Sequence, residues 1–303
     1  MGGVGVHAPA GAPSIRSVGV VGIGLIGGSI ALALRRARPE VRLIGVDRGP
    51  ALDRASAMGV FDRLGSDLST LREADLVALA APVRQNASLL VRLGEVLTAS
   101  VLITDTGSTK RVVLDAARRL PPHVSFVGGH PLAGSARAGA DAARADLFRG
   151  RPWLLTPCGA TRAPRDVDRV AALVTELGAE PRVIDGEAHD QVIAFLSHLP
   201  QLTASALMHV VGTRVGALDL TLAGPGLADT TRLAASPPAI WRDICATNSD
   251  AIVPALDALI DTLRRLRDDL STGDAIVEVF GSAGRWREVI ESTTIRTEDE
   301  EGD

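Results

Sequence analysis

The stretch GVVGIGLIGGS, residues 19–29, decides the fold expected for this chain. Its glycines Gly22, Gly24 and Gly27 have the G-x-G-x-x-G spacing, directly after a short apolar run and at the start of a helical pattern. In such a turn the first glycine makes the bend and the second lets the backbone approach a pyrophosphate, while the third lets the helix pack closely on the strand. A glycine-rich turn alone is weak evidence, so its surroundings must decide whether it binds a dinucleotide.

The next apolar run supplies the acidic residue that a dinucleotide site needs. Residues 41–47, VRLIGVD, end at Asp47, twenty positions after Gly27, where a carboxylate would accept both ribose hydroxyls. The same carboxylate would repel the 2′-phosphate of NADP, so NAD is the favoured cofactor. Arg48 keeps NADP open as the less favoured one, because a guanidinium could hold that phosphate.

Apolar runs alternate with helical patterns up to residue 186. Because the runs are continuously apolar, they predict a parallel sheet covered by helices on both faces, extended by three further runs with mixed direction at one edge. Ligands bind such a sheet beyond the carboxyl ends of its strands. The cofactor-binding candidates there are Gly22, Gly24, Leu25, Ile26, Gly27, Asp47, Arg48, Ala81, Pro82, Val83, Asp105 and Thr106.

The segment DTGSTK, residues 105–110, follows one of these strands. Ser108 and Lys110 in it are further candidates for the nicotinamide edge of the site. The alternative is a structural role, with Ser108 or Thr106 capping the helix that follows.

After about residue 187 the strand patterns stop. Residues 188–211 are apolar on nearly every side, which predicts a buried helix interrupted at Pro200. A later stripe at alternating spacings of four and three needs a partner helix, in the same chain or in a second subunit. The stripe consists of Ile252, Leu256, Leu259, Leu263, Leu266 and Leu270.

The fold class predicted is an α/β Rossmann-type dinucleotide-binding domain followed by an all-α helical domain. The first domain is expected over residues 17–186 and the second over residues 187–291. Residues 1–16 are expected to form a disordered N-terminal segment, and residues 292–303 an acidic disordered tail.

The composition excludes several classes of function. With 46% hydrophobic and 22% charged residues among 303, the chain can bury a sizeable core. A net charge of −4 provides no broad basic field, so a small molecule is expected as partner, rather than nucleic acid or a membrane surface. No apolar run is long enough to span a bilayer. Cys158 and Cys245 match neither a disulfide framework nor a metal site, which predicts a cytoplasmic protein without a metal.

The stretch FVGGHPLAGS, residues 126–135, places His130 at the carboxyl end of a predicted strand, near Ser108. A lone histidine is more often structural than catalytic. Here, however, two glycines remove neighbouring side chains and Pro131 keeps the chain extended, which favours a presented imidazole. A dehydrogenase that oxidises an alcohol needs a base beside the hydride acceptor, and neutral imidazole suits that task near pH 7.

Five blocks of this sequence, in this order, resemble the prephenate and arogenate dehydrogenases of tyrosine biosynthesis. The resemblance extends from about residue 17 to residue 290. It implies an NAD-dependent oxidoreductase whose helical domain forms a homodimer, so that the leucine stripe becomes a subunit contact. The blocks are GIGLIGGS (22–29), DTGSTK (105–110), GGHPLAGS (128–135), HDQVIAFLSHLP (189–200) and DTTRLAASPPAIWRDI (229–244).

The resemblance also implies roles for individual residues. His130 would be the proton acceptor and Ser108 would orient the same substrate hydroxyl. Arg232 would grip a substrate carboxylate through two parallel hydrogen bonds. His198 would line the substrate pocket, with a satisfied core histidine as the alternative. His189 and Asp190 are expected to cap the start of their helix.

Two departures from the family pattern concern the substrate. Many prephenate-using members have a histidine where this chain has Gln201, and an acidic residue where Ala136 follows Ser135. All three positions belong to the substrate end of the site in the family. Prephenate dehydrogenase is therefore the first expectation, and arogenate dehydrogenase or a dual-substrate cyclohexadienyl dehydrogenase is the alternative. A non-catalytic NAD-binding sensor is the alternative from another class.

Overall fold

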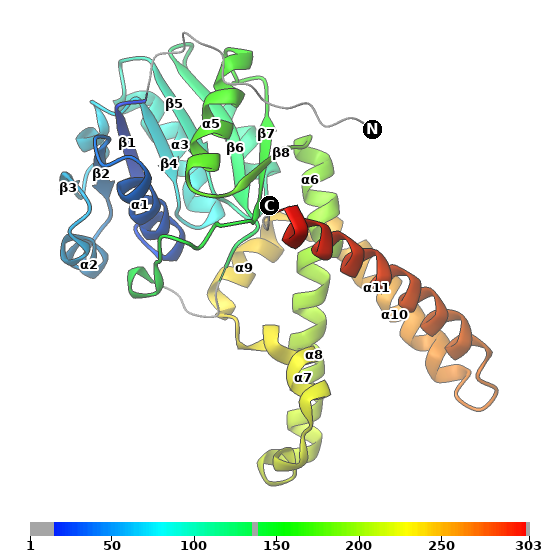
Figure 1. Cartoon of the computed structure of the whole chain (residues 1–303). Helices are drawn as coiled ribbons and strands as arrows, with labels where there is room; N and C mark the ends of the chain where they lie inside the picture. The colour runs from blue at the N-terminus through cyan, green and yellow to red at the C-terminus, as the bar shows by residue number, and fades with distance from the viewer. Residues whose placement is uncertain (1–14, 135–138, 301–303) are drawn as a thin grey trace. The chain divides into compact units, whose positions relative to one another are not determined.

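The computed structural model describes residues 15–134 and 139–300. The chain divides into two compact units between Ser249 and Asp250. The first unit contains the sheet and the helices up to α9, and the second contains α10 and α11 (Figure 1). The first unit extends beyond residue 186, where the sequence predicts the boundary between the dinucleotide-binding domain and the helical domain. That domain boundary stays a prediction.

The first unit is built on one sheet with the strand order β3-β2-β1-β4-β5-β6-β7-β8. Strands β1 to β6 pair in parallel, β7 is antiparallel to β6, and β8 is parallel to β7. This arrangement confirms the predicted Rossmann-type fold and the mixed direction at one edge. The strands are β1 (Ser17–Val21), β2 (Arg42–Val46), β3 (Arg63–Gly65), β4 (Leu76–Leu79), β5 (Val101–Asp105), β6 (Val124–Pro131), β7 (Pro152–Pro157) and β8 (Glu180–Val183).

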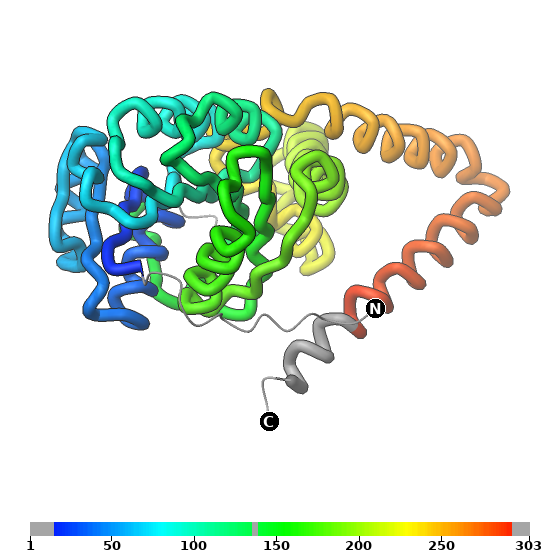
Figure 2. The backbone as a smooth tube through the Cα atoms, turned by 90° about the horizontal axis from the view of Figure 1, so that it is seen from above, coloured from blue at the N-terminus to red at the C-terminus, as the bar shows by residue number. Residues whose placement is uncertain are grey.

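Helices cover both faces of the sheet, as expected for strands that are apolar on both sides. In Figure 2 the chain of α3 and α4 runs along one side of the strands, and α1 and α5 lie on the other. The helices of this part are α1 (Leu25–Ala37), α2 (Pro50–Met58), α3 (Val83–Val96), α4 (Arg111–Ala117) and α5 (Pro164–Glu176), with short 3-10 turns η1 (Leu68–Leu71) and η2 (Ala140–Ala142).

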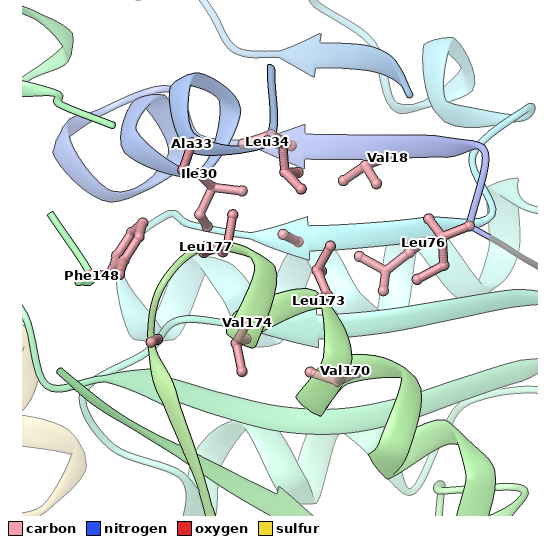
Figure 3. Packing of buried hydrophobic residues seen from close by; sticks show 14 of the residues in the cluster. Val18, Ile30, Ala33, Leu34, Leu76, Phe148, Val170, Leu173, Val174 and Leu177 are labelled. Atoms are coloured by element: carbon pink, nitrogen blue, oxygen red, sulfur yellow. The ribbon is translucent and has the colours of Figure 1, made fainter. Parts of the chain in front are cut away.

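The core on the α1 side is one cluster of buried side chains from α1, α5 and the strands. Ile30 and Leu34, one turn apart on α1, are both buried against the strands. Figure 3 shows Leu34 toward Val18 of β1, Ile30 next to Leu177, and Leu173 of α5 on the side of Leu76 of β4. This packing fixes the start of α1, and with it the glycine turn, on the carboxyl ends of β1 and β4.

The helical part begins with α6 (Gly186–Ile193), a π-helical turn (Ala194–His198) and α7 (Leu199–Asp219). The π turn ends two residues before Pro200, whose missing N–H and bulky ring disturb the helix as predicted. The remaining elements of the first unit are η4 (Leu220–Leu222), α8 (Pro225–Thr231), η5 (Arg232–Ala235) and α9 (Pro238–Thr247).

The expected burial of residues 188–211 is wrong for this single chain. Phe195, Leu196 and Val210 are 50%, 71% and 56% exposed. A helix that is apolar on every side is predicted to be buried. The pattern does not indicate whether the residues that pack against it belong to the same chain.

The second unit consists of α10 (Ser249–Asp268) and α11 (Asp274–Glu300), joined by a short turn. An ion pair of Arg265 with Glu278 links the two helices. Helix α11 continues beyond residue 291, where the sequence predicted the end of the helical domain. Within the described residues, no helix combines the length and the apolar character that a membrane span requires.

Candidate active site

The three glycines of the turn have the separate roles that their spacing predicts. Gly22 has φ +89°, and a Cβ there would lie 2.8 Å from the carbonyl carbon of Ala80. A Cβ on Gly27 would lie 2.0 Å from the Gly22 oxygen, so α1 packs on the turn only without a side chain. At Gly24, in contrast, a Cβ would meet no described atom within 4 Å. The space over Gly24 is therefore open for a ligand.

Two cavities flank this turn and share Ala81. One, of about 280 Å³, is lined by Gly24, Leu25, Ile26, Ala80, Ala81, Pro82, Val83, Thr106, Gly107, Ser108, Gly139, Pro237, Ile240, Asp243 and Ile244. The other, of about 590 Å³, is lined by Val21, Gly22, Val46, Asp47, Arg48, Ser66, Leu68, Ala81, Arg84, Gln85, Ser88, Leu89 and Arg92. A pair of cavities on either side of an open glycine backbone fits the two halves of a dinucleotide.

Asp47 directly follows β2 and lines the second cavity, at the position predicted for a ribose ligand. Its carboxylate accepts hydrogen bonds from the backbone N–H groups of Ile23, at 2.6 Å, and Arg48, at 2.7 Å. These bonds hold the carboxylate beside the glycine turn. Arg48 lines the same cavity and its side chain is exposed.

Asp105 does not present its side chain to either cavity, which corrects the expectation that it contacts the cofactor. The carboxylate is fully buried and pairs with Lys110 Nζ at 2.6 Å, and it also accepts the N–H groups of Gly107 and Gly129. Lys110 Nζ in turn donates to the Gly129 carbonyl at 2.7 Å. The pair fastens the segment after β5 to β6, so both residues stabilise the backbone that borders the first cavity.

Ser108 and Thr106 line the first cavity, as expected for the nicotinamide edge. Neither caps α4, so the alternative structural role is wrong. The cap comes from elsewhere in the chain: Asp190 accepts the N–H groups of Lys110, at 2.7 Å, and Arg111, at 3.0 Å.

His130 lies in β6 and is 7% exposed, so it is buried rather than presented to solvent. The glycines before it are required by close packing: a Cβ on Gly128 would lie 2.1 Å from Thr156 Oγ1, and one on Gly129 would lie 2.5 Å from the Asp105 carbonyl oxygen. They allow β6 to fit between β5 and β7, which places the imidazole at the carboxyl end of the parallel strands.

A chain of hydrogen bonds connects His130 with a buried carboxylate. His130 Nδ1 lies 2.9 Å from His189 Nε2, and His189 Nδ1 lies 2.8 Å from Asp190 Oδ1. The expectation that His189 and Asp190 cap their own helix is wrong, because Asp185 caps α6 through the N–H groups of Glu187 and Ala188.

This chain determines which nitrogen of each ring carries a proton. The Asp190 carboxylate only accepts, so His189 Nδ1 donates and the neutral ring accepts at Nε2. His130 must then donate from Nδ1, which leaves the lone pair on Nε2. The arrangement gives His130 the tautomer that a general base needs.

The directions of the pKa shifts agree with neutral His130 and His189 hydrogen-bonded to an ionised Asp190. Burial, reinforced by His189, Lys110 and His198, lowers the pKa of His130 well below its usual value. Burial also lowers the pKa of His189, although the hydrogen bond to Asp190 opposes the shift. Burial would raise the pKa of Asp190, but the hydrogen bonds that it accepts outweigh this effect and lower it.

The residues predicted to bind the substrate divide into three groups. His198 is buried on the π turn, and burial lowers its pKa to about 4. Arg232 begins η5 and is exposed. Ser135 and Ala136 lie outside the described residues.

Gln201 is buried, and its amide is committed to protein partners. Its Nε2 donates to the Leu233 carbonyl at 2.7 Å and its Oε1 accepts from Ser236 Oγ at 3.0 Å. Gln201 therefore holds the η5 turn that begins with Arg232.

Sequence reasoning missed the partners that orient the site. It gave no role at the reacting end to His189, Asp190 or Asn248, nor to the α9 residues in the first cavity. One signal was available: the His-Asp pair precedes His198 by nine residues on the same helical segment, and two buried histidines so placed need partners.

Comparisons with known proteins agree with this geometry. The family model described as "Prephenate dehydrogenase, nucleotide-binding domain" matches residues 30–183, and "Prephenate dehydrogenase, dimerization domain" matches residues 185–281. A prephenate dehydrogenase of Bacillus subtilis is 36% identical over 277 residues, covering 89% of this chain and 74% of that protein. A cyclohexadienyl dehydrogenase of Zymomonas mobilis is 34% identical over 280 residues, covering 90% and 95%.

A solved structure shares the whole architecture. The prephenate dehydrogenase of Aquifex aeolicus, in complex with hydroxyphenyl propionate and NAD⁺, superposes with a TM-score of 0.83 at 29% identity. The match covers 92% of this chain and 100% of that one.

The glycine turn predicts a contrast between two alanine substitutions. Gly27→Ala should destabilise the fold by about 1–3 kcal/mol, because its Cβ overlaps the Gly22 carbonyl. Gly24→Ala should leave the melting temperature unchanged but weaken NAD⁺ binding at least about tenfold, because the methyl group occupies the approach to the pyrophosphate. Thermal unfolding and calorimetric titration measure the two effects. Unchanged NAD⁺ affinity in Gly24→Ala would refute this placement of the cofactor.

Proposed function

The chain belongs to the prephenate dehydrogenase family, and from this premise we propose that it converts prephenate to 4-hydroxyphenylpyruvate by oxidative decarboxylation, in tyrosine biosynthesis. It is an NAD-dependent oxidoreductase. The observation that carries the assigned mechanism is the hydrogen-bonded chain from His130 through His189 to Asp190, which leaves a lone pair on His130 Nε2.

The cofactor would span the two cavities around Gly24. NAD⁺, when bound, supplies the hydride acceptor. Asp47 would bind the ribose hydroxyls, and the open backbone at Gly24 and the N-terminus of α1 would face the pyrophosphate. Thr106 and Ser108 line the cavity that would hold the nicotinamide half.

In the reaction, His130 would take the proton from the C4 hydroxyl of the substrate while C4 loses its hydride. Ser108 would orient the same hydroxyl. As CO₂ leaves C1, the electrons of the broken bond pass through the ring to the C4 oxygen. His130 then returns its proton to that oxygen, so the overall reaction releases no net proton and the ring becomes aromatic.

Two features bear on the choice of substrate. Arg232 would bind a carboxylate of the substrate, which prephenate and arogenate share. The two substrates differ in the side chain, a keto group in prephenate and an amino group in arogenate. Because the Gln201 amide is occupied by Leu233 and Ser236, Gln201 would act by holding the Arg232 turn, without contacting that side chain. Arogenate therefore remains the second candidate substrate, alone or beside prephenate.

We also propose a homodimer formed by the helical part. The matching family model carries the description "dimerization domain". The chain also leaves large apolar side chains exposed on α11, including Val277 at 76%, Phe280 at 69% and Trp286 at 69%. Exposure of this extent on neighbouring turns is typical of an interaction surface. A cytoplasmic location is proposed as well, since Cys158 and Cys245 are both free thiols.

The activity is tested by adding prephenate or arogenate with NAD⁺ and following NADH absorbance. We expect NADH with prephenate, and a kcat/KM for prephenate above that for arogenate. The reverse order would make the protein an arogenate dehydrogenase. NAD⁺ binding by folded protein without turnover of either substrate would instead indicate a cofactor sensor.

His130→Asn should reduce kcat by at least about a hundredfold, the usual effect of a lost general base, with unchanged NAD⁺ affinity. His123→Asn, just before the amino end of β6 and therefore at the opposite edge of the sheet, serves as control and should stay within about twofold. In the wild type, kcat/KM should stay constant as pH falls to 6.5 and decline only below it, because the base must be unprotonated and burial lowers its pKa. A wild-type midpoint at or above pH 6.5, or an active His130→Asn variant, would remove His130 from this role.

The dimer is tested by light scattering after gel filtration. The wild-type chain should elute with the mass of two chains, and Phe280→Glu should shift it to one, because a buried carboxylate without a partner opposes association. Val183→Glu is the matched control: Val183 is 64% exposed, but it lies on β8. A monomeric wild-type protein, or equal behaviour of both variants, would contradict the proposed surface.

A further inference from the structure

His198 lies in the part of the π turn that faces the His130 network. Its ring is 1% exposed, and it is near enough to His130 that a charge on it would lower the pKa of His130. Its Nδ1 lies 3.3 Å from Asn248 Nδ2, and Trp241 packs edge-on against the ring, at 5.9 Å between centroids. Nothing in the family comparison or in the sequence patterns assigns a role to Asn248.

The orientation of the Asn248 amide is determined by its other partners. Arg111 Nη2 donates to Asn248 Oδ1 at 2.9 Å, so the oxygen of the amide is on that side. Asn248 Nδ2 donates to the Asp190 backbone carbonyl at 2.8 Å. An NH₂ group has two hydrogens, and the second is directed at His198 Nδ1.

His198 must therefore accept at Nδ1. A ring that accepts at Nδ1 while neutral carries its proton on Nε2, and burial keeps it neutral by lowering its pKa to about 4. Nε2 is buried and has no hydrogen-bond partner among the described residues. A buried N–H of this kind is costly unless an acceptor reaches it.

We propose that Asn248 is a positioning residue of the reaction, which holds the proton of His198 on Nε2 so that His198 donates a hydrogen bond to an oxygen of the substrate. The inference rests on the proposed function for the identity of that substrate. His130 and His198 are thus locked in opposite tautomers by one anchor, formed from Asp190 and Asn248. One ring accepts at Nε2 and the other donates there.

The two tautomers suit the substrate chemistry. A cyclohexadienyl substrate has one hydroxyl proton to give, which His130 accepts, and several oxygen atoms that can only accept, in its carboxylates. A neutral N–H donor can bind such an oxygen without placing a positive charge of its own next to His130. It therefore contributes to binding while the base stays unprotonated.

The direct test is the tautomer of His198 in the wild-type enzyme. Long-range ¹H–¹⁵N correlation spectra of protein labelled in its histidines distinguish protonation at Nδ1 from protonation at Nε2, and the signals that vanish in His198→Gln identify the residue. We expect neutral His198 with the proton on Nε2 at pH 7. A proton on Nδ1 overturns the proposal. This result does not depend on turnover, so it remains separate from a failure of the proposed function, which would appear as absent NADH.

Asn248→Asp tests the positioning role by reversing the hydrogen bond to His198, while it also removes the donor to the Asp190 backbone carbonyl. A carboxylate can only accept, so His198 Nδ1 would have to donate, and the proton would move from Nε2 to Nδ1. We expect kcat/KM for the substrate to fall at least about tenfold, as for other tautomer reversals, with NAD⁺ affinity unchanged. The spectra of the same variant should show the reversed tautomer. Reversal of the tautomer with unchanged kcat/KM would overturn the proposal.

A second pair of variants separates donation from packing. His198→Gln can place an amide N–H near the position of Nε2, whereas His198→Met fills similar space without a donor. We expect the glutamine variant to have at least about tenfold higher kcat/KM than the methionine variant, one hydrogen bond to a charged group being worth at least that factor. Equal activities would show that His198 acts through packing alone and would overturn the proposal.

Discussion

The buried Asp190 carboxylate is the interaction on which the rest of the site depends. It is 1% exposed, and it accepts hydrogen bonds from His189, from the backbone of Lys110 and from both the backbone and the side chain of Arg111. A buried carboxylate without such donors would be very costly. Each donor is therefore held in place by the others. The start of α4, which follows strand β5, cannot shift relative to α6 without breaking the set.

The segment from Asp105 to Lys110 carries this restraint into the sheet. The Lys110 amide bonds to Asp190, while its ammonium bonds to Asp105 and to the Gly129 carbonyl, one residue before His130. Both ends of the hydrogen-bonded histidine chain are thus attached to the same segment: His130 through β6, and Asp190 through α4. Thr106 and Ser108, which line the first cavity, lie within this segment. The first cavity and His130 are consequently positioned by a single stretch of backbone.

The sequence predicts the sheet well because its determinants are local. Gly22, Gly24 and Gly27 each have a role that spacing and sterics alone define, and the apolar runs give the strands. The sequence indicates that the buried histidines need partners, but it does not identify them, because Asp190 bonds to residues about 80 positions earlier and Asn248 to residues 50 to 137 positions earlier. The prediction that Asp105 contacts the cofactor failed for a related reason. The sequence shows that Asp105 lies at the end of a strand, but its pairing with Lys110 depends on the direction of its side chain. The apolar pattern of residues 188–211 indicates that the helix is to be buried, but it does not show whether the residues that bury it belong to the same chain.

The network also separates reaction chemistry from substrate choice. The groups proposed to move the proton are buried, hydrogen-bonded and joined to the sheet, so substitutions among them affect every substrate alike. Arg232, in contrast, is exposed and depends on Gln201, which holds the adjacent Leu233 carbonyl from α7. The Gln201 amide uses both its donor and its acceptor here, since its Nε2 donates to the Leu233 carbonyl and its Oε1 accepts from Ser236 Oγ. Gln201 therefore fastens the η5 turn at two points, so the backbone position of Arg232 is set from α7.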